Sequence, residues 1–250
     1  MSLKGLEKFA GLAHSALYFR LERKYNFKMR VILMIVLVAV YSVGQQPVSL
    51  PTADGGVVFA DVFGAGERGV VLAHGGRFNK ESWAKQVPAF VSAGFRVVAI
   101  DFRGRGQSKG GTELKPGDEG LRYDVLAAVL YLREHGTKRI SLVGGSMGGT
   151  AAAEAAVEAK AGEIESVVII AAEGGEHPEK MMGRTLYITA RDDIGPGNVP
   201  RLPGIRANFD KARQPKEFVL LEGSAHAQFL FETEQGERLL REILRFLAAK

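Results

Sequence analysis

The chain of 250 residues is long enough for one large domain, and its 46% hydrophobic and 24% charged residues are typical of a folded globular protein. It contains no cysteine, which excludes disulfides, thiolate metal sites and a cysteine nucleophile. The net charge of +5 arises in the first 30 residues, where seven Lys and Arg face two Glu, so the rest of the chain is formally neutral and nucleic acid is not an expected partner.

A short uncharged apolar run, residues 31–43, follows this basic segment. The run is shorter than the roughly 20 residues that span a bilayer comfortably, and it has the length of the apolar part of a signal peptide. Two alternatives follow: Met29 is the working start of a signal peptide, or residues 1–28 form a basic helix on the cytoplasmic side of an anchor. A third alternative is that the run is a buried strand or helix of the fold.

Both membrane-related alternatives place the following domain outside the cytoplasm, because basic segments stay on the cytoplasmic side. We therefore expect a secreted, periplasmic or membrane-anchored protein. Its N-terminal segment, residues 1–44, would associate with the membrane through residues 20–44. The functional domain is expected over residues 45–250.

From residue 45 onward, apolar runs alternate with amphipathic stretches. The middle runs are almost continuous Val, Ile and Leu, which is typical of strands covered on both faces. This alternation predicts the α/β class, with a mostly parallel eight-stranded sheet flanked by helices. The expected strands begin at residues 48, 57, 69, 95, 139, 166, 185 and 217, and the expected helices span residues 81–93, 119–135, 147–161, 201–213 and 233–249.

The stretch LVGGSMGGT, residues 142–150, joins the fifth expected strand to a helix and places four glycines around one serine. A phosphate-binding loop would need a lysine where Thr150 stands. A dinucleotide-binding turn would need a glycine in place of Ser146 and would follow the first strand. The stretch does fit the pattern GxSxG, in which a serine on a strained strand-to-helix turn presents its hydroxyl. Ser146 is therefore the candidate nucleophile.

A serine hydroxyl needs a neighbouring base, and histidine is the usual one. His226 follows the last expected strand, and the carboxyl ends of parallel strands share the edge of the sheet where ligands bind. Ser146 and His226 are therefore expected at the same edge. The other four histidines suit other roles: His14 precedes the domain, His74 ends a strand in HGG, His135 ends a helix and His177 lies in a polar loop.

Five motifs in order resemble the α/β-hydrolase superfamily: HGG after the third strand, DFRGRGQS after the fourth, GGSMGG after the fifth, ARDDIGP after the seventh and SAHAQF after the eighth. The resemblance covers residues 48–250. It implies an oxyanion hole formed by the backbone N–H groups of Met147 and of the loop after His74, here Gly76. It also implies that Asp101 and Arg103 order their loop, and it implies no metal and no cofactor.

The superfamily usually places an acid after the seventh strand, as Gly-x-x-Asp followed closely by proline. Ala190 stands at the glycine position, which makes Asp193 the acid that would orient the histidine. Asp192 is the alternative; otherwise it points away from the site or braces the loop against Arg191. Glu173, after the sixth strand, is a third candidate.

Many superfamily members insert a lid between the sixth and seventh strands, but here only residues 173–184 fill that gap. An open site is therefore expected, with a preference for short or flexible acyl chains, because little enclosed apolar surface would reward a long chain. The apolar residues expected at its edge are Phe78, Met181 and Phe229 as pocket residues, with Trp83, Met147 and Met182 beside them.

These features predict a serine hydrolase without cofactor that cleaves a small-molecule carboxylic ester through an acyl-enzyme. A thioesterase, a peptidase or an acyltransferase could use the same residues. A ligand-binding or signalling protein that keeps the fold with negligible turnover is the alternative from another class.

Overall fold

The computed structural model describes residues 44–112, 114 and 118–249. The predicted signal or anchor run lies outside these residues, so the alternatives for the N-terminal segment stay predictions. In the part of the chain that the structure describes, no helix is long and apolar enough to cross a bilayer. Residues from Gly44 onward belong to one compact unit.

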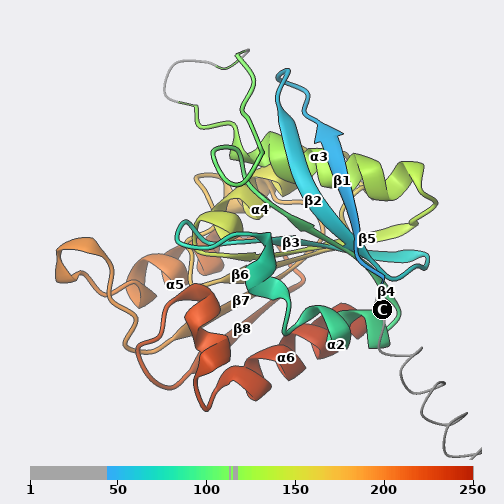
Figure 1. Cartoon of the computed structure of the whole chain (residues 1–250). Helices are drawn as coiled ribbons and strands as arrows, with labels where there is room; N and C mark the ends of the chain where they lie inside the picture. Colours follow the sequence, from blue (N-terminus) through green and yellow to red (C-terminus); the bar gives the residue numbers. More distant parts are fainter. Residues whose placement is uncertain (1–43, 113, 115–117, 250) are drawn as a thin grey trace, which may run out of the picture. The chain divides into compact units, whose positions relative to one another are not determined.

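Eight strands form a single twisted sheet in the order β1-β2-β4-β3-β5-β6-β7-β8 (Figure 1). β1 and β2 pair antiparallel, β2 pairs antiparallel with β4, and the remaining neighbours are parallel. The predicted mostly parallel eight-stranded sheet is confirmed. The strands are β1 (Gln46–Pro51), β2 (Val57–Phe63), β3 (Arg68–Ala73), β4 (Phe95–Ile100), β5 (Arg139–Gly145), β6 (Ser166–Ile170), β7 (Arg184–Ala190) and β8 (Lys216–Leu221).

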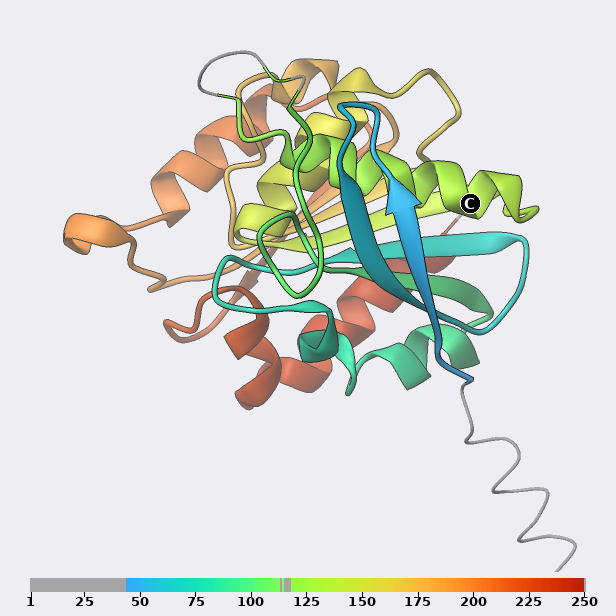
Figure 2. The same ribbon diagram turned by 45° about the horizontal axis from the view of Figure 1, so that its top comes forward.

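Helices cover both faces of the sheet (Figure 2). α2 (Val87–Ser92) and α6 (Gly236–Ala248) lie on one face, and α3 (Leu121–Glu134), α4 (Met147–Glu158) and α5 (Leu202–Lys211) lie on the other. Short 3-10 helices occupy the loops: η1 (Lys80–Trp83), η2 (Pro178–Lys180), η3 (Pro196–Asn198) and η4 (Ala227–Glu232).

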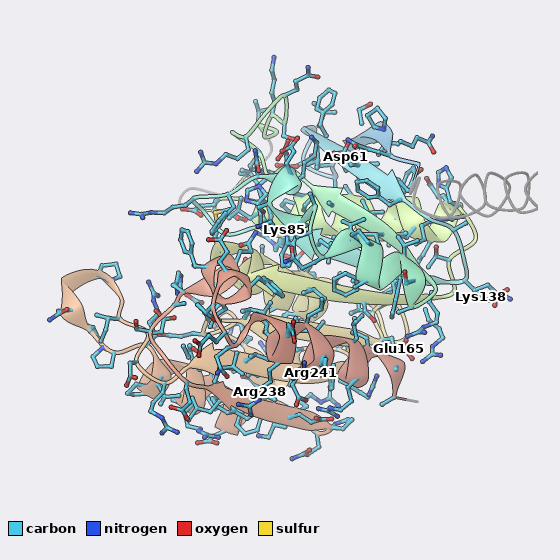
Figure 3. All side chains as sticks on the ribbon, turned by 60° about the horizontal axis from the view of Figure 1, so that its bottom comes forward. Asp61, Lys85, Lys138, Glu165, Arg238 and Arg241 are labelled. Carbon is cyan, nitrogen blue, oxygen red and sulfur yellow. The ribbon has the colours of Figure 1, made fainter. Side chains whose placement is uncertain are left out.

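The spacing of apolar residues directs each helix onto the sheet, as α6 illustrates. Leu239, Ile243 and Phe246 follow one another at intervals of three to four residues and are buried. Arg238 and Arg241 are exposed on the solvent side of the same helix (Figure 3). The helix therefore contributes its apolar stripe to the core.

The predicted continuous helix over residues 81–93 is wrong. The chain forms the 3-10 helix η1, passes through a turn and only then begins α2. Pro88 lies in the first turn of α2, and a proline has no N–H to continue a preceding helix and would clash with the carbonyl four residues earlier. Likewise, α6 begins at Gly236 and not at residue 233, because η4 occupies the chain before it.

Candidate active site

Ser146 stands at a sharp turn between β5 and α4. Its backbone has φ 51° and ψ −119°, a conformation that residues other than glycine rarely adopt and that costs about 1–3 kcal/mol. Close backbone contacts require the neighbouring glycines: a Cβ on Gly144 would collide with the Gly148 carbonyl, and a Cβ on Gly148 with the Ala73 carbonyl. The turn therefore presents the Ser146 side chain at the carboxyl edge of the parallel strands.

Three side chains form one chain of hydrogen bonds at this edge. His226 Nε2 lies 2.8 Å from Ser146 Oγ, and His226 Nδ1 lies 2.7 Å from Asp193 Oδ2. As a carboxylate, Asp193 can only accept, so Nδ1 carries the proton and Nε2 is left to accept the Ser146 hydroxyl proton. Asp193 follows β7 and His226 follows β8, in the orange and red loops that leave the same edge of the sheet (Figure 1).

The loop after β7 brings Asp193, and not Asp192, against His226. Asp193 is only 1% exposed, whereas Asp192 is exposed to solvent. Of the two alternatives for Asp192, the structure fits a side chain in solvent and not a brace against Arg191, because the Arg191 guanidinium pairs with Glu222 at 3.0 Å. The surroundings of the two adjacent carboxylates therefore differ completely.

Two further charged residues, Arg201 and Glu173, lie near Asp193 and the cavity beside Ser146. The second oxygen of Asp193, Oδ1, faces Arg201 Nε at 3.6 Å, an ion pair without a hydrogen bond. The guanidinium offsets part of the buried charge of Asp193. Glu173 is exposed, and its carboxylate lies over Gly204 in α5.

The structure fixes the directions of the two backbone N–H groups predicted to form the oxyanion hole, those of Met147 and Gly76. Met147 is the first residue of α4, and the first N–H groups of a helix have no partner within the helix. The Gly75 carbonyl accepts hydrogen bonds from His74 Nδ1 at 2.8 Å and from the Phe78 N–H at 2.9 Å. In a trans peptide the next N–H, that of Gly76, points the opposite way.

His74 is a buried side chain that holds this loop through hydrogen bonds to the backbone. Its Nε2 accepts the Phe102 N–H at 3.2 Å, which leaves the proton on Nδ1 for the Gly75 carbonyl. Burial lowers the pKa of His74, so the neutral ring that this arrangement needs is favoured. A Cβ on Gly76 would lie 3.7 Å from Met147 Sδ, which places the two N–H-bearing segments next to each other.

Asp101 and Arg103 hold the loop after β4 in place. Asp101 Oδ1 accepts the Lys80 N–H at 2.8 Å. Arg103 pairs with Asp54 and with Asp124, each at 2.6 Å. Burial opposes the ionisation of Asp54, but the hydrogen bonds and charge of Arg103 outweigh it and lower the pKa of Asp54 to about 2. Burial raises the pKa of Asp124.

A cavity of about 550 Å³ opens beside Ser146, and a second cavity of about 580 Å³ shares four of its lining residues. The first cavity has a mostly polar lining that includes Thr150, Glu173, Glu176, Arg201 and Asn208. The second extends from Met147, Thr150, Gly175 and Glu176 to a group of acidic residues, Asp118, Glu119, Glu154 and Glu158, with Arg122 among them.

The predicted apolar pocket is wrong in part. Met181 is 2% exposed and Trp83 is fully buried, so both belong to the core and cannot contact a substrate. Phe78 and Phe229 pack against each other beside the His226 loop, with ring centroids 4.8 Å apart, and neither lines the two cavities. Phe229 remains 40% exposed at the rim of the site.

Several lining residues escaped the sequence analysis. Thr150 could have been found, because it lies one helical turn after Ser146 and so shares its face of α4. Glu176 lies in a loop, Arg201 directly precedes α5, and Asn208 is a polar residue within α5, so nothing in the local sequence marks them as lining residues. Within the described residues, no group of three or more His, Asp or Glu side chains is placed to hold a metal ion.

The chain is similar to known hydrolases and haloperoxidases in sequence. It is 34% identical over 123 residues to a non-heme chloroperoxidase of Kitasatospora aureofaciens, covering 48% of this chain and 42% of the relative. It is 39% identical over 94 residues to a 2-hydroxy-6-oxononadienedioate/2-hydroxy-6-oxononatrienedioate hydrolase of Paraburkholderia phymatum, covering 36% of this chain and 31% of the relative. The chain thus matches less than half the length of these curated relatives.

Solved structures share its fold at low sequence identity. An esterase of Pyrococcus furiosus superposes with a TM-score of 0.67 at 18% identity, covering 82% of this chain and 90% of that chain. A bromoperoxidase of Bacillus anthracis superposes with a TM-score of 0.65 at 18% identity, covering 82% of this chain and 100% of that chain. The model of the "Alpha/beta hydrolase family" matches residues 70–248. The predicted resemblance is confirmed, and the chain belongs to the alpha/beta hydrolase family.

Proposed function

We propose that this protein is a serine hydrolase that cleaves small carboxylic esters through an acyl-enzyme at Ser146. The observation that carries the proposal is the unbroken chain of hydrogen bonds from Ser146 through His226 to the buried Asp193. A hydroxyl on a strained turn, a base within reach of its proton and an acid that orients the base are what nucleophilic catalysis by serine requires.

In the acylation step, Ser146 Oγ attacks the ester carbonyl carbon while His226 Nε2 accepts the hydroxyl proton. The negative charge that develops on the carbonyl oxygen is stabilised by the N–H groups of Met147 and Gly76. Asp193 keeps the imidazole in the required tautomer and stabilises its protonated form. Collapse of the tetrahedral intermediate breaks the bond to the alcohol oxygen, which takes the proton from His226 as the alcohol leaves.

Deacylation repeats these steps with water. His226 Nε2 removes a proton from the water, whose oxygen attacks the acyl carbon. The second tetrahedral intermediate collapses to release the carboxylic acid, and the proton returns to Ser146 Oγ. All of these groups belong to the chain or to water, so the proposed cycle uses no cofactor.

The substrate is proposed to carry a short or flexible acyl chain. Between β6 and β7, where all residues are described, the chain forms only the 3-10 helix η2 and no cap domain. The cavity that Ser146 lines has a mostly polar lining, which would not reward the burial of a long alkyl chain.

Activity-based labelling with a fluorophosphonate, followed by mass spectrometry of the labelled peptide, tests the proposal. We expect covalent modification at Ser146, hydrolysis of an activated acetyl or butyryl ester with a burst of alcohol, and loss of both in Ser146→Ala. Labelling at another serine, with activity retained in the variant, would contradict the proposal.

An ester series on the same preparation tests the substrate range. We expect kcat/KM to fall from butyryl to long-chain esters, without a jump when the substrate forms micelles. Faster turnover of thioesters or amides, or acyl transfer to an added alcohol in preference to water, would move the assignment to another reaction of the same acyl-enzyme.

A further inference from the structure

A buried glutamine joins the loops around Ser146. Gln228 is 4% exposed and lies two residues after His226, in η4. Its side-chain carbonyl accepts a hydrogen bond from the Gly75 N–H at 2.8 Å. Its amide nitrogen donates to Ser82 Oγ at 2.7 Å. The side chain therefore connects the loop of the proposed base to the loop after β3 and to η1.

The partners of the amide determine its orientation. A backbone N–H can only donate, so the Gln228 carbonyl must face Gly75. Ser82 Oγ gives its own proton to the Asn79 carbonyl at 2.6 Å, so it accepts from the Gln228 nitrogen. Both halves of the amide are used, and an aliphatic side chain could satisfy neither partner.

The glutamine carbonyl lies between the two segments that carry the proposed oxyanion donors. A Cβ on Gly75 would lie 3.1 Å from Gln228 Oε1, and a Cβ on Gly145 would lie 3.0 Å from the same atom. Gly75 directly precedes Gly76, and Gly145 lies two residues before Met147. One oxygen therefore fills the space between both segments.

The backbone before Gln228 is held in an unfavourable conformation to reach this position. Ala227 has a φ of 51°, which residues other than glycine rarely adopt, and it is fully packed at 1% exposure. This turn points His226 to one side and Gln228 to the other.

We infer that Gln228 is a positioning residue that holds the Gly76 and Met147 N–H groups in register with His226. The inference rests on the proposed hydrolase function. It assigns to Gln228 no contact with the substrate: it acts through the Gly75 N–H and through its packing against Gly145.

Gln228→Met tests the inference, because methionine has a similar volume but cannot form either hydrogen bond. We expect kcat for an acetyl ester to fall about 10- to 30-fold, less than the 10²–10³-fold typical of losing a donor outright, while KM changes less than about twofold. Ser82→Ala, which removes only the distant anchor, should lower kcat by about two- to fivefold.

Binding of inhibitors separates positioning from general destabilisation. An alkyl trifluoromethyl ketone forms a tetrahedral oxyanion with the serine, whereas the matching amide stays uncharged. In Gln228→Met we expect the inhibition constant of the ketone to rise about tenfold and that of the amide to stay within about twofold. Gln86→Met is the matched control, because Gln86 is a buried glutamine (7% exposed) outside the site. Gln86→Met should lower the free energy of unfolding and leave both inhibition constants unchanged.

Hydrogen exchange at the Gly75 amide tests the contact independently of activity. The Gly75 N–H should exchange at least about tenfold faster in Gln228→Met and unchanged in Gln86→Met. If wild-type protein turns over esters and Gln228→Met retains its kcat, or if both inhibitors weaken equally, the inference is wrong. If wild-type protein fails to react with fluorophosphonate or ester, the proposed function is wrong instead. Should Gln228→Met not fold, Ser82→Ala decides by the same measurements.

Discussion

Two adjacent aspartates after β7 allow the role of a single carboxylate to be tested. Asp193 is buried and bonded to His226 Nδ1 at 2.7 Å, whereas Asp192 is exposed. In Asp193→Asn the side-chain amide can donate to Nδ1, which moves the imidazole proton to Nε2 and removes the acceptor that Ser146 needs. We expect kcat to fall about 10⁴-fold, as in well-studied triads, with KM little changed.

Asp192→Asn is the matched control in steady-state kinetics, since it removes the same charge one residue away. It should stay within about tenfold of the parent, because its carboxylate lies in solvent and its charge is screened. The opposite ranking of the two variants would assign the orienting role to Asp192. Two small effects would point to Glu173.

Residues differ in how far their local sequence predicts their role. Ser146 could be located from nine consecutive letters, because the glycines that its turn requires are its own neighbours. Gln228 could not, since its partner Gly75 is 153 positions away and nothing beside Gln228 in the sequence indicates that contact. Met181 was misplaced for a related reason: an apolar residue near a site in sequence looks the same whether it faces the core or the pocket.

At the scale of elements, Arg103 joins the turn between β1 and β2 to α3. It pairs with Asp54 in that turn and with Asp124 in the first turn of α3. Because the pKa of Asp54 is lowered from 3.8 to about 2 in the folded protein, this carboxylate adds stability above pH 4. That contribution is lost as the pH falls from about 4 towards 2.

Urea unfolding of Asp54→Asn measures this contribution. The free energy of unfolding should be lower than in wild type by about 2 kcal/mol at pH 7, and the difference should vanish as the pH approaches 2. Asp210→Asn, at an exposed position in α5, should leave stability unchanged at both pH values. A difference for Asp54→Asn that persists undiminished at pH 2 would mean that it arises from packing and not from charge.

The elements themselves follow from the sequence to different degrees. The buried strands β3 to β7 could be predicted from their mainly apolar runs, because covering both faces of a parallel sheet leaves few solvent-facing positions. The segment of η1 and α2 could not be read as two helices from its apolar spacing alone. There Pro88 prevents one continuous helix, although the spacing of the apolar side chains would allow it.

For the molecule as a whole, charge is distributed unevenly although the functional domain is formally neutral. The second cavity is lined by five acidic side chains and one arginine among the described residues, Asp118, Glu119, Glu154, Glu158, Glu176 and Arg122. Arg122 already pairs with Asp118 at 2.6 Å and with Glu158. The second cavity, which adjoins the cavity beside Ser146, therefore has an excess of negative charge.

Glu154 is a half-buried carboxyl group in the lining of this cavity, and we expect it to favour cationic substrates. Burial raises the pKa of Glu154, the charge of Arg122 opposes this rise, and the nearby Asp118 adds to it. An ester with an ammonium group in its alcohol part should have a kcat/KM about tenfold above that of its uncharged isostere, and 0.5 M salt should reduce the ratio. Glu154→Gln should reduce the ratio about threefold without changing kcat/KM for the neutral ester. Glu234→Gln, at an exposed position before α6, should change neither the ratio nor kcat/KM for the neutral ester. Equal rates for the two esters in wild-type protein would show that the acidic cavity does not hold the alcohol part of the substrate.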